Sequence, residues 1–270
     1  MPEGHTIHRQ ARILRERFGG TTVAATSPQG RFATGAAGLD GRTMTATEAH
    51  GKHMFARFGD RGDPSTPYLH VHLGLYGKWT LGDGEAPEPR GALRLRLHNE
   101  RGWADLRGPI TCDVVDAEGR GLVLSKLGPD PLRTDADPSL AAARIQRSRT
   151  PIGLLLMQQD VVSGIGNVYR AELLFRAGID PGRPGRDVSA REWESMWTDL
   201  VTLMKAGVRS GRIVTTRPEH RSRRSGTARR EDAHYVYRRH VEPCRVCGTT
   251  ISLREAAGRK LYWCPRCQAD

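Results

Sequence analysis

The first half of the chain alternates hydrophobic and polar positions with the period of a β-strand. Between residues 93 and 98, leucines alternate with arginine and histidine, which is typical of a half-buried strand. Residues 53–58 and 68–73 follow a similar pattern, and glycine- and proline-rich stretches separate such segments. Several short strands at this spacing between residues 21 and 125 predict an antiparallel β-sandwich.

Other segments repeat their apolar residues every three or four positions, as amphipathic helices do. Residues 3–18 place their apolar side chains on one face and end at two glycines, which predicts an N-terminal helix. A second helix is predicted over residues 167–177, where Gly178 stops it. Ser189 and Glu192 form a capping-box pattern that opens a long third helix. The chain is therefore predicted to combine a β domain with a helical one in a multi-domain α+β fold.

The charge balance is strongly basic and favours a polyanionic partner. Lysine and arginine number 42 against 30 acidic residues, which gives a formal net charge of +12. Basic groups placed at phosphates release counterions, so this excess predicts nucleic-acid binding. The alternative is that the charge serves solubility and binds no ligand. Residues 209–239 are rich in arginine and poor in apolar residues, and predict a basic loop near the nucleic acid or an ordinary solvated loop.

The chain contains no apolar stretch of about 18 residues, so the sequence predicts no transmembrane helix and no membrane partner. The first ten residues lack the charged-then-apolar pattern of a signal peptide, and we expect a cytoplasmic protein.

Four of the five cysteines form two C-x-x-C pairs near the C-terminus. Cys244 and Cys247 make the first pair, and Cys264 and Cys267 make the second. This spacing is typical of a tetrahedral four-thiolate zinc site, with the intervening residues forming a β-hairpin. We therefore predict one structural Zn²⁺ that supplies much of the folding energy of a small zinc ribbon. Cys112 stands alone and is interpreted as a buried core thiol.

The second and third residues, Pro2 and Glu3, could carry covalent chemistry. Removal of the initiator methionine would give Pro2 a free secondary amine, and such an amine can attack a sugar C1′ to form an iminium ion. A terminal amine has a pKa near 8 and is therefore deprotonated more often at pH 7 than a lysine. The neighbouring Glu3 could shuttle protons. Alone, however, these two residues also fit an incidental start of a chain.

Six motifs occur in order along the chain and resemble those of one enzyme family. They are residues 1–4 (MPEG), 50–55 (HGKHMF), 72–77 (HLGLYG), 127–132 (LGPDPL), 163–172 (SGIGNVYRAE) and 244–268, which contains GRKLYWCPRCQ. Together they resemble the formamidopyrimidine-DNA glycosylase / endonuclease VIII family over essentially the whole chain, and the endonuclease VIII-like branch in particular.

The resemblance implies three domains, with DNA running between the two larger ones. We expect an N-terminal catalytic β-sandwich domain with its N-terminal helix over residues 1–125. A helix–two-turn–helix DNA-binding domain with the basic loop should follow over residues 126–235, and a C-terminal β-hairpin zinc finger over residues 236–270. We expect the protein to act as a monomer on damaged, duplex DNA.

The resemblance also implies roles for five residues of this chain. Pro2 resembles the family's nucleophile, and Glu3 resembles the acid/base that assists sugar ring opening and elimination. Lys52, Asn167 and Arg259 resemble the residues that contact phosphates around the lesion, and the first and last of these are counted with the catalytic residues. Arginine suits a bidentate phosphate contact better than lysine does.

Further positions are expected to occupy the gap that an extruded base leaves. Leu75 and Tyr76 stand where the family places such residues, although both could also belong to the core of the sheet, and Arg107 is a weaker candidate. Two positions depart from the family pattern. Thr6 replaces a second glutamate of the N-terminal motif, and Gly74 replaces a glutamine of some endonuclease VIII-like members.

We therefore predict a bifunctional DNA glycosylase and abasic-site lyase of base excision repair. It should remove oxidised bases, with pyrimidines favoured, through a Schiff base at Pro2 and nick the strand by β,δ-elimination. Two alternatives remain: the same chemistry on oxidised purines, and a non-catalytic nucleic-acid-binding protein. A tautomerase that uses an N-terminal proline would need neither the zinc ribbon nor the basic residues.

Overall fold

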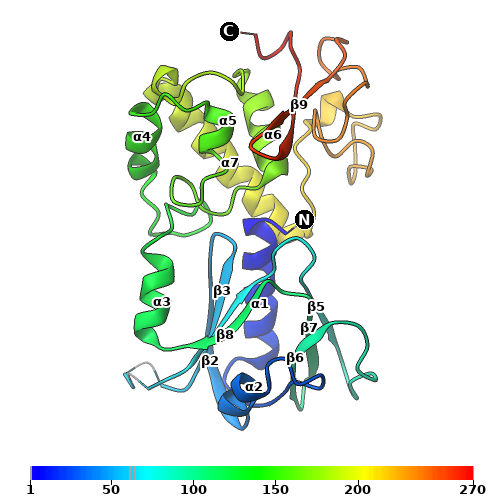
Figure 1. Ribbon diagram of the computed structural model, residues 1–270. Helices are drawn as coiled ribbons and strands as arrows, with labels where there is room; N and C mark the ends of the chain where they lie inside the picture. The colour runs from blue at the N-terminus through cyan, green and yellow to red at the C-terminus, as the bar shows by residue number, and fades with distance from the viewer. Residues whose placement is uncertain (1, 61, 64, 270) are drawn as a thin grey trace. The chain divides into compact units, whose positions relative to one another are not determined.

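The computed structural model describes residues 2–60, 62–63 and 65–269, and the chain divides into two compact units (Figure 1). The N-terminal unit comprises Met1–Lys126 and the C-terminal unit comprises Leu127–Asp270. Each unit has a hydrophobic core of its own. In the part of the chain that the structure describes, no helix is both long and apolar enough to cross a membrane.

Eight antiparallel strands make up the sheet of the N-terminal unit, in the order β5-β7-β6-β1-β2-β3-β4-β8. They are β1 (Thr21–Thr26), β2 (Arg42–His50), β3 (His53–Phe58), β4 (Tyr68–His72), β5 (Lys78–Gly82), β6 (Leu93–Asn99), β7 (Gly102–Arg107) and β8 (Thr111–Val115).

Strand β1 makes this sheet a sandwich because its two halves have different partners. Residues 21–23 pair with β2, whereas residues 24–26 pair with β6. One strand therefore belongs to both layers, and the alternating leucines of β6 point into the space between them, where all three are fully buried. The predicted antiparallel β-sandwich is confirmed.

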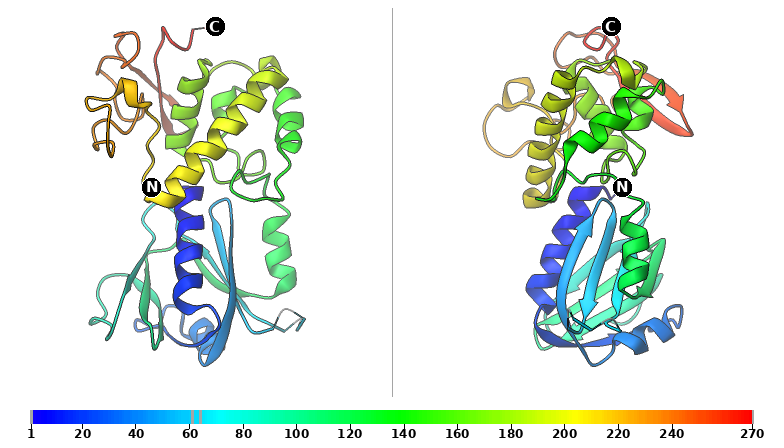
Figure 2. Two further views of the ribbon diagram at one scale, coloured as in Figure 1. Left: turned by 180° about the vertical axis from the view of Figure 1, so that it is seen from behind. Right: turned by 90° about the vertical axis from the view of Figure 1, so that its left-hand side faces the viewer.

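The helix α1 (Gly4–Phe18) packs on β2 and β3 of the same unit (Figure 2). Its buried side chains include Ile7, Leu14 and Phe18, which recur at helical spacing and form the predicted apolar face. The helix ends where Gly19 donates its backbone N–H to the carbonyl of Arg15. Because α1 begins at the fourth residue, Pro2 and Glu3 lie at a helix N-terminus.

Two short helices of the N-terminal unit interrupt the predicted run of strands. Helix α2 (Ala33–Leu39) buries only two small or aliphatic side chains, and α3 (Ala117–Leu124) buries none. Neither helix has a strong apolar stripe, because glycines occupy several of their positions. Local capping helps to fix α3, since the Asp116 side chain accepts a hydrogen bond from the N–H of Gly119.

The C-terminal unit begins with helices. They are α4 (Pro138–Gln146), α5 (Ile152–Leu155), α6 (Asn167–Ala177) and α7 (Ala190–Ser210), with 3₁₀ turns η1 (Gly185–Asp187) and η2 (Pro218–His220). Helices α5 and α6 are separated by two turns, which gives the helix–two-turn–helix arrangement. The predicted second helix matches α6, where Gly178 adopts a left-handed conformation. The predicted capping box opens α7, with both of its hydrogen bonds formed.

A two-stranded hairpin completes this unit. It consists of β9 (Ser252–Ala256) and β10 (Arg259–Trp263), and Ala257 and Gly258 between them both have positive φ, as a tight two-residue hairpin turn requires. A separate small core joins the hairpin region to α6 through Phe175, Tyr235 and Tyr262, among others. The zinc ribbon therefore packs against the helices instead of standing alone.

The carboxylate of Glu172 on α6 holds this packing together. The side chain is fully buried and accepts three backbone hydrogen bonds, from Tyr235 (2.7 Å), Val236 (2.8 Å) and Tyr237 (2.8 Å). The hydroxyl of Thr215 donates a fourth hydrogen bond to it. A buried charge is tolerated only when it is hydrogen-bonded in this way, so these donors and the carboxylate depend on each other.

We expect Glu172→Gln to destabilise the C-terminal unit by about 2–4 kcal/mol, because the amide turns an N–H group toward buried donors. Chemical denaturation followed by fluorescence measures the change in the free energy of unfolding. Glu194→Gln, at an exposed position of α7, is the matched control and should change stability by less than about 0.5 kcal/mol. Equal stabilities for the two variants would contradict this role of Glu172.

Candidate active site and zinc centre

Pro2 and Glu3 lie immediately before α1, in the N-terminal unit. Pro2 is half-buried, whereas Glu3 is fully buried. Glu3 is the N-cap residue, and its backbone carbonyl accepts hydrogen bonds from the N–H groups of Thr6 (2.9 Å) and Ile7 (3.4 Å). Its side chain makes no cap hydrogen bond to the helix. The positive end of the helix dipole favours a negative charge at this position.

His5 and Thr6 lie in the first turn of α1, and Thr6 is one of the two positions that depart from the family pattern. His5 is buried, and its Nε2 lies 3.2 Å from the hydroxyl of Thr6. Burial lowers the pKa of His5 to about 4, so its ring is neutral near pH 7. Thr6 thus supplies a neutral hydroxyl and no second carboxylate, which leaves Glu3 as the acidic residue of this segment.

Lys52 lies in the turn between β2 and β3. The flanking residues His50 and His53 pair across the hairpin, and Gly51 has a φ of 59°, which the tight turn requires. Lys52 is half-buried. Burial is the main reason that the pKa values of His53 and His72 are lowered, and the positive charge of Lys52 lowers them further. The lysine is thus held on a rigid hairpin, as a phosphate-binding residue should be.

Three histidines form a compact cluster that the sequence analysis missed. His53 Nδ1 lies 2.9 Å from His70 Nε2, and the rings of His53 and His72 are 4.8 Å apart. Burial lowers the pKa of His53 to about 3 and that of His70 to about 4, and it also lowers the pKa of His72. The alternation of His70 and His72 on β4 was a signal that could have found this shared face.

Leu75 and Tyr76 lie in an exposed turn after β4. Their exposed fractions are 59% and 87%, which excludes the interpretation that they are core residues of the sheet. Gly74 starts the turn with a φ of 64°, and a Cβ there would lie 3.1 Å from Ile110 Cβ. The 73%-exposed Ile110 is therefore a neighbour of this turn, and its backbone N–H donates to the carbonyl of His72. A conspicuous isoleucine in a glycine- and proline-containing turn was the only sequence signal for it.

Arg107 has a structural partner within its own sheet. Its Nη2 donates to Asp105 Oδ2 (2.7 Å), and its Nε donates to the carbonyl of Arg90 (3.1 Å). Asp105 is fully buried and also binds Arg96, with an Nε–Oδ1 distance of 2.7 Å. Arg107 thus neutralises a buried carboxylate, and its side chain is mostly covered.

Asn167 and Arg259 are brought together in the C-terminal unit. Asn167 is the first residue of α6, and its side-chain amide donates to the backbone carbonyl of Lys260 (2.9 Å). The fully buried Arg170 donates to the same carbonyl (3.2 Å) and to the Asn167 side-chain oxygen. The tip of the hairpin is thereby fixed to the N-terminus of α6, and the adjacent Arg259 remains exposed. A helix N-terminus and an exposed arginine together form a suitable phosphate-binding surface.

The four paired cysteines have the geometry of a metal centre. Their sulfur atoms all lie within 4.8 Å of one another, and the distances from Cys244 to Cys267 and from Cys247 to Cys264 are 3.9 and 3.4 Å. Zn–S bonds of about 2.3 Å in a tetrahedron would separate the sulfurs by about 3.8 Å. The residues therefore fit one structural Zn²⁺, with four protein ligands and no position left for substrate.

Further contacts fix the zinc ribbon to the helical part of the unit. The buried side chain of Gln268 accepts a hydrogen bond from the N–H of Cys264 (2.9 Å) and donates to the carbonyl of Ile179 (2.9 Å). By contrast, Cys112 lies in the core of the N-terminal unit, where burial raises the pKa of its thiol to about 12. It is an unreactive core thiol, as predicted.

Comparison with known sequences identifies the family. The N-terminal domain of formamidopyrimidine-DNA glycosylase matches residues 1–111, its H2TH domain matches residues 127–218, and a zinc finger found in FPG and IleRS matches residues 242–269. Endonuclease 8 1 of Mycobacterium tuberculosis (strain ATCC 25618 / H37Rv) is 49% identical over 99% of this chain and 100% of its own length. The chain belongs to the formamidopyrimidine-DNA glycosylase / endonuclease VIII family.

Other members of the family are more distant. Formamidopyrimidine-DNA glycosylase of Geobacillus kaustophilus is 34% identical over 86% of this chain and 84% of its own length. A structure of the Lactococcus lactis enzyme in complex with abasic-site-containing DNA superimposes with a TM-score of 0.80 at 22% identity, covering 99% of this chain and 100% of that one. This likeness confirms the predicted fold.

Family membership establishes the coarse function. The protein is a DNA-repair glycosylase with lyase activity at abasic sites, and it binds DNA. The interpretation as a non-catalytic nucleic-acid-binding protein was therefore wrong. The sequence feature that argued against it is the presence of both the N-terminal motif and the zinc ribbon in one chain.

Removing zinc from this glycosylase should unfold the ribbon, because the ribbon has little core apart from its packing against α6. We expect one Zn²⁺ per chain by metal analysis, and Cys264→Ser should lose it together with the hairpin's protection from hydrogen exchange. Cys112→Ser is the control and should retain the metal. A Cys264→Ser protein that keeps a full zinc equivalent would contradict the assignment.

The histidine cluster predicts that acid destabilises the N-terminal unit. The folded-state pKa values of His53 and His70 lie below the usual 6.5, so the unfolded state binds more protons and stability is lost as the pH falls from about 6.5 toward 4. Each histidine contributes at most about 1.4 kcal/mol per pH unit, less solvent screening. Urea unfolding at several pH values measures this slope. His70→Gln should reduce it, whereas His98→Gln, at an exposed position, should not.

Proposed function

We propose that this glycosylase removes oxidised bases from duplex DNA, with pyrimidines favoured, through a Schiff base at Pro2. The observation that carries the proposal is the placement of Pro2 and the buried Glu3 at the N-terminus of α1. Once Met1 is removed, Pro2 would carry a free secondary amine next in sequence to the carboxyl group of Glu3. An amine nucleophile with an adjacent acid/base is what Schiff-base chemistry at a sugar requires.

The reaction proceeds in five steps that conserve atoms and charge. The Pro2 nitrogen attacks C1′, and the bond from C1′ to the damaged base breaks, so that the base leaves with a proton. Opening of the sugar ring then forms an iminium ion between Pro2 and C1′, and Glu3 transfers the protons. Loss of a C2′ proton expels the 3′-phosphate, and a second elimination expels the 5′-phosphate. Hydrolysis of the iminium ion restores Pro2. Zinc has no part in these steps.

Each unit contributes phosphate-binding residues to the proposed complex. Lys52 lies on the β2–β3 hairpin, whereas Asn167 donates to the carbonyl of Lys260, the residue that follows Arg259. Phosphate contacts of this kind fix the register of a protein on DNA without reading its sequence. Rigid supports matter because a small displacement of the sugar from the nucleophile slows the reaction strongly.

The exposed turn that carries Leu75 and Tyr76 supports a base-extrusion step. Both side chains are available to enter a DNA stack, and inserted apolar or aromatic groups offset the cost of unstacking. We propose that Ile110 assists them, because it is exposed beside the same turn. Arg107 is a poorer candidate for the gap, since it is held by buried Asp105.

A pyrimidine preference is supported by the endonuclease VIII-like sequence of that turn and by the 49% identity to Endonuclease 8 1. The same chemistry on oxidised purines is the second candidate, because the N-terminal domain also matches that of formamidopyrimidine-DNA glycosylase. We further propose that the protein acts as a monomer. The three matched regions support a division into domains at residues 1–125, 126–235 and 236–270.

Borohydride trapping tests the nucleophile directly. The protein is incubated with a labelled duplex containing one abasic site, and borohydride reduces any iminium ion to a stable adduct that a denaturing gel resolves. We expect an adduct with the native N-terminus and at least a roughly hundredfold loss in Pro2→Gly or in a form extended by an N-terminal tag. Undiminished trapping by the tagged form would sink the Pro2 assignment.

Glu3→Gln and a set of lesions separate the remaining steps. Glu3→Gln should slow strand cleavage more than DNA binding, because it removes proton transfer and keeps the shape of the side chain. Duplexes carrying an oxidised pyrimidine or 8-oxoguanine, compared by kcat/KM, decide the base preference. Faster turnover of 8-oxoguanine would select the second candidate without affecting the Schiff-base mechanism.

A further inference from the structure

The segment between α7 and the zinc ribbon forms an arginine-rich loop, residues 217–231, whose ends are tied together. The N–H of Thr215 donates to the carbonyl of Ala233 (2.9 Å), and the hydroxyl of Thr216 donates to the carbonyl of Asp232 (2.6 Å). We call these four residues the stem. The loop contains six arginines and two glutamates, and most of its side chains are exposed. It is thus a basic surface element on a closed stem.

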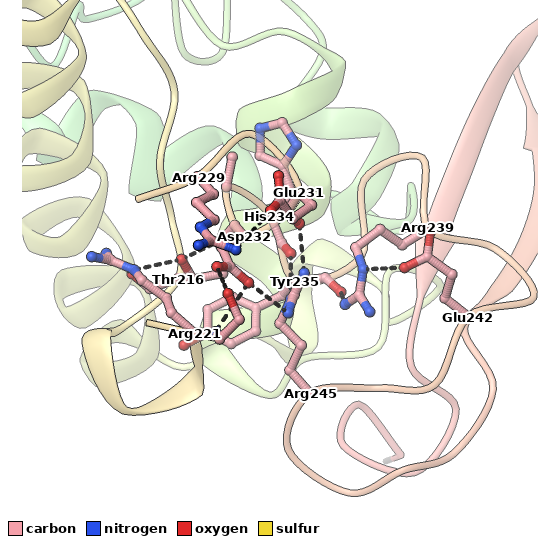
Figure 3. A network of polar contacts seen from close by, with 12 residues as sticks. Thr216, Arg221, Arg229, Glu231, Asp232, His234, Tyr235, Arg239, Glu242 and Arg245 are labelled. Carbon is pink, nitrogen blue, oxygen red and sulfur yellow. Dashed lines mark hydrogen bonds and ion pairs between the residues drawn. The ribbon is translucent and has the colours of Figure 1, made fainter. Parts of the chain in front are cut away.

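Asp232 connects the stem to the loop itself (Figure 3). The side chain is buried, and its Oδ2 accepts a hydrogen bond from the hydroxyl of Ser222 (2.5 Å). Its Oδ1 accepts from the N–H of Ser222 (3.2 Å) and from Arg245 Nη1 (3.2 Å). One carboxylate therefore fixes the loop at Ser222 and receives a guanidinium from outside the loop.

That guanidinium belongs to the first cysteine pair, because Arg245 directly follows Cys244. Besides Asp232, Arg245 donates to the backbone carbonyls of Glu231 (2.6 Å) and His234 (3.1 Å). Its side chain is only 17% exposed. A single arginine thus contacts three acceptors on one side of the stem, and the planar guanidinium suits such a multiple contact.

We propose that Arg245 is a positioning residue that couples the zinc centre to the arginine-rich loop, and that the loop in this position binds the phosphate backbone of DNA. The DNA part of this inference rests on the proposed function. Zinc fixes the backbone at Cys244, and therefore fixes the start of the Arg245 side chain. The guanidinium of Arg245 then contacts the stem in one orientation. Because the loop is already ordered, it loses less conformational entropy when its arginines bind DNA.

A second attachment holds the start of the loop and does not involve the cysteines. The N–H of Arg217 donates to the hydroxyl of Tyr235 (2.9 Å), and His220 Nδ1 lies 2.8 Å from the same oxygen. The backbone N–H of Tyr235 in turn donates to Glu172 on α6. Loss of zinc should therefore loosen the loop near Ser222 and Asp232 while leaving this attachment to the helix in place.

Hydrogen exchange measured by mass spectrometry on the zinc-loaded full chain tests the coupling. In Arg245→Gln, we expect exchange in residues 217–231 to quicken about tenfold, with tryptic cleavage after Arg223 and Arg224 accelerating in parallel. The matched control is Arg266→Gln, the exposed arginine of the second cysteine pair, which should behave as wild type. Stripping zinc from the wild type should bring loop exchange to the level of Arg245→Gln. Unchanged exchange in Arg245→Gln would overturn the coupling.

A second variant keeps the test independent of metal binding. Asp232→Asn leaves the cysteine pair untouched, so it should retain one Zn²⁺ per chain and still release the loop. If Asp232→Asn retains zinc and the loop stays protected from hydrogen exchange, the proposal is wrong. This conclusion holds even if Arg245→Gln loses its zinc. Metal analysis accompanies each exchange measurement.

DNA binding measured against salt concentration separates this proposal from the proposed function. Arg245→Gln should weaken DNA binding about tenfold and lower the salt dependence, because fewer phosphates are neutralised. Borohydride trapping at saturating DNA should still give the Pro2 adduct. A released loop with unchanged DNA affinity would overturn the loop's role at the phosphates, whereas loss of trapping in the wild type would overturn only the proposed chemistry.

Discussion

The C-terminal unit depends on a single buried carboxylate. Glu172 lies on the inner face of α6 and accepts the backbone N–H groups of three consecutive residues, 235–237. A helix can hold an irregular segment this firmly only if the segment's donors are satisfied, because unpaired N–H groups in an apolar core would cost several kcal/mol together. The same segment leads directly into the zinc ribbon. The carboxylate therefore fixes the segment that leads into the ribbon, and one side of the arginine-rich loop, to the same helix on which Asn167 and Arg170 hold the hairpin at Lys260.

In the N-terminal unit, strand pairing and the packing of α1 position the functional residues. Strand β1 belongs to both layers of the sandwich, and α1, which precedes it, packs on β2 and β3. The N-terminus of a chain is normally its least ordered part. Here α1 buries an apolar face from its first turn to its last, and Glu3 is covered completely. That burial fixes the start of α1, which holds the backbone next to Pro2, the residue proposed as the nucleophile.

Local signals predicted those parts of the fold that depend on local physics. Helix α6 ends where Gly178 adopts a left-handed conformation, and α7 begins at a complete capping box. The sequence therefore predicted both of these helix ends. Helix α3 was missed because it buries no side chain and its pattern therefore carries no period. The histidine cluster and the donors to Glu172 were missed for another reason. The donors to Glu172 lie up to 65 positions from it, and neither periodicity nor spacing reports such contacts. The alternation of His70 and His72 indicates a shared face of β4, but it does not report the contact of that face with His53.

Net charge predicted the kind of partner but could not locate its binding surface, because arginines in this chain perform two different tasks. Some neutralise carboxylates within the fold, as in the bidentate contact of Arg176 with Asp199, where both N–O distances are 2.6 Å. Others are exposed, as in the loop of residues 217–231. Arg245 belongs to the first group by its contacts, yet those contacts hold members of the second group in place. A structural ion pair can thus contribute to DNA binding without contacting DNA, because it determines how ordered the basic loop is before DNA binds.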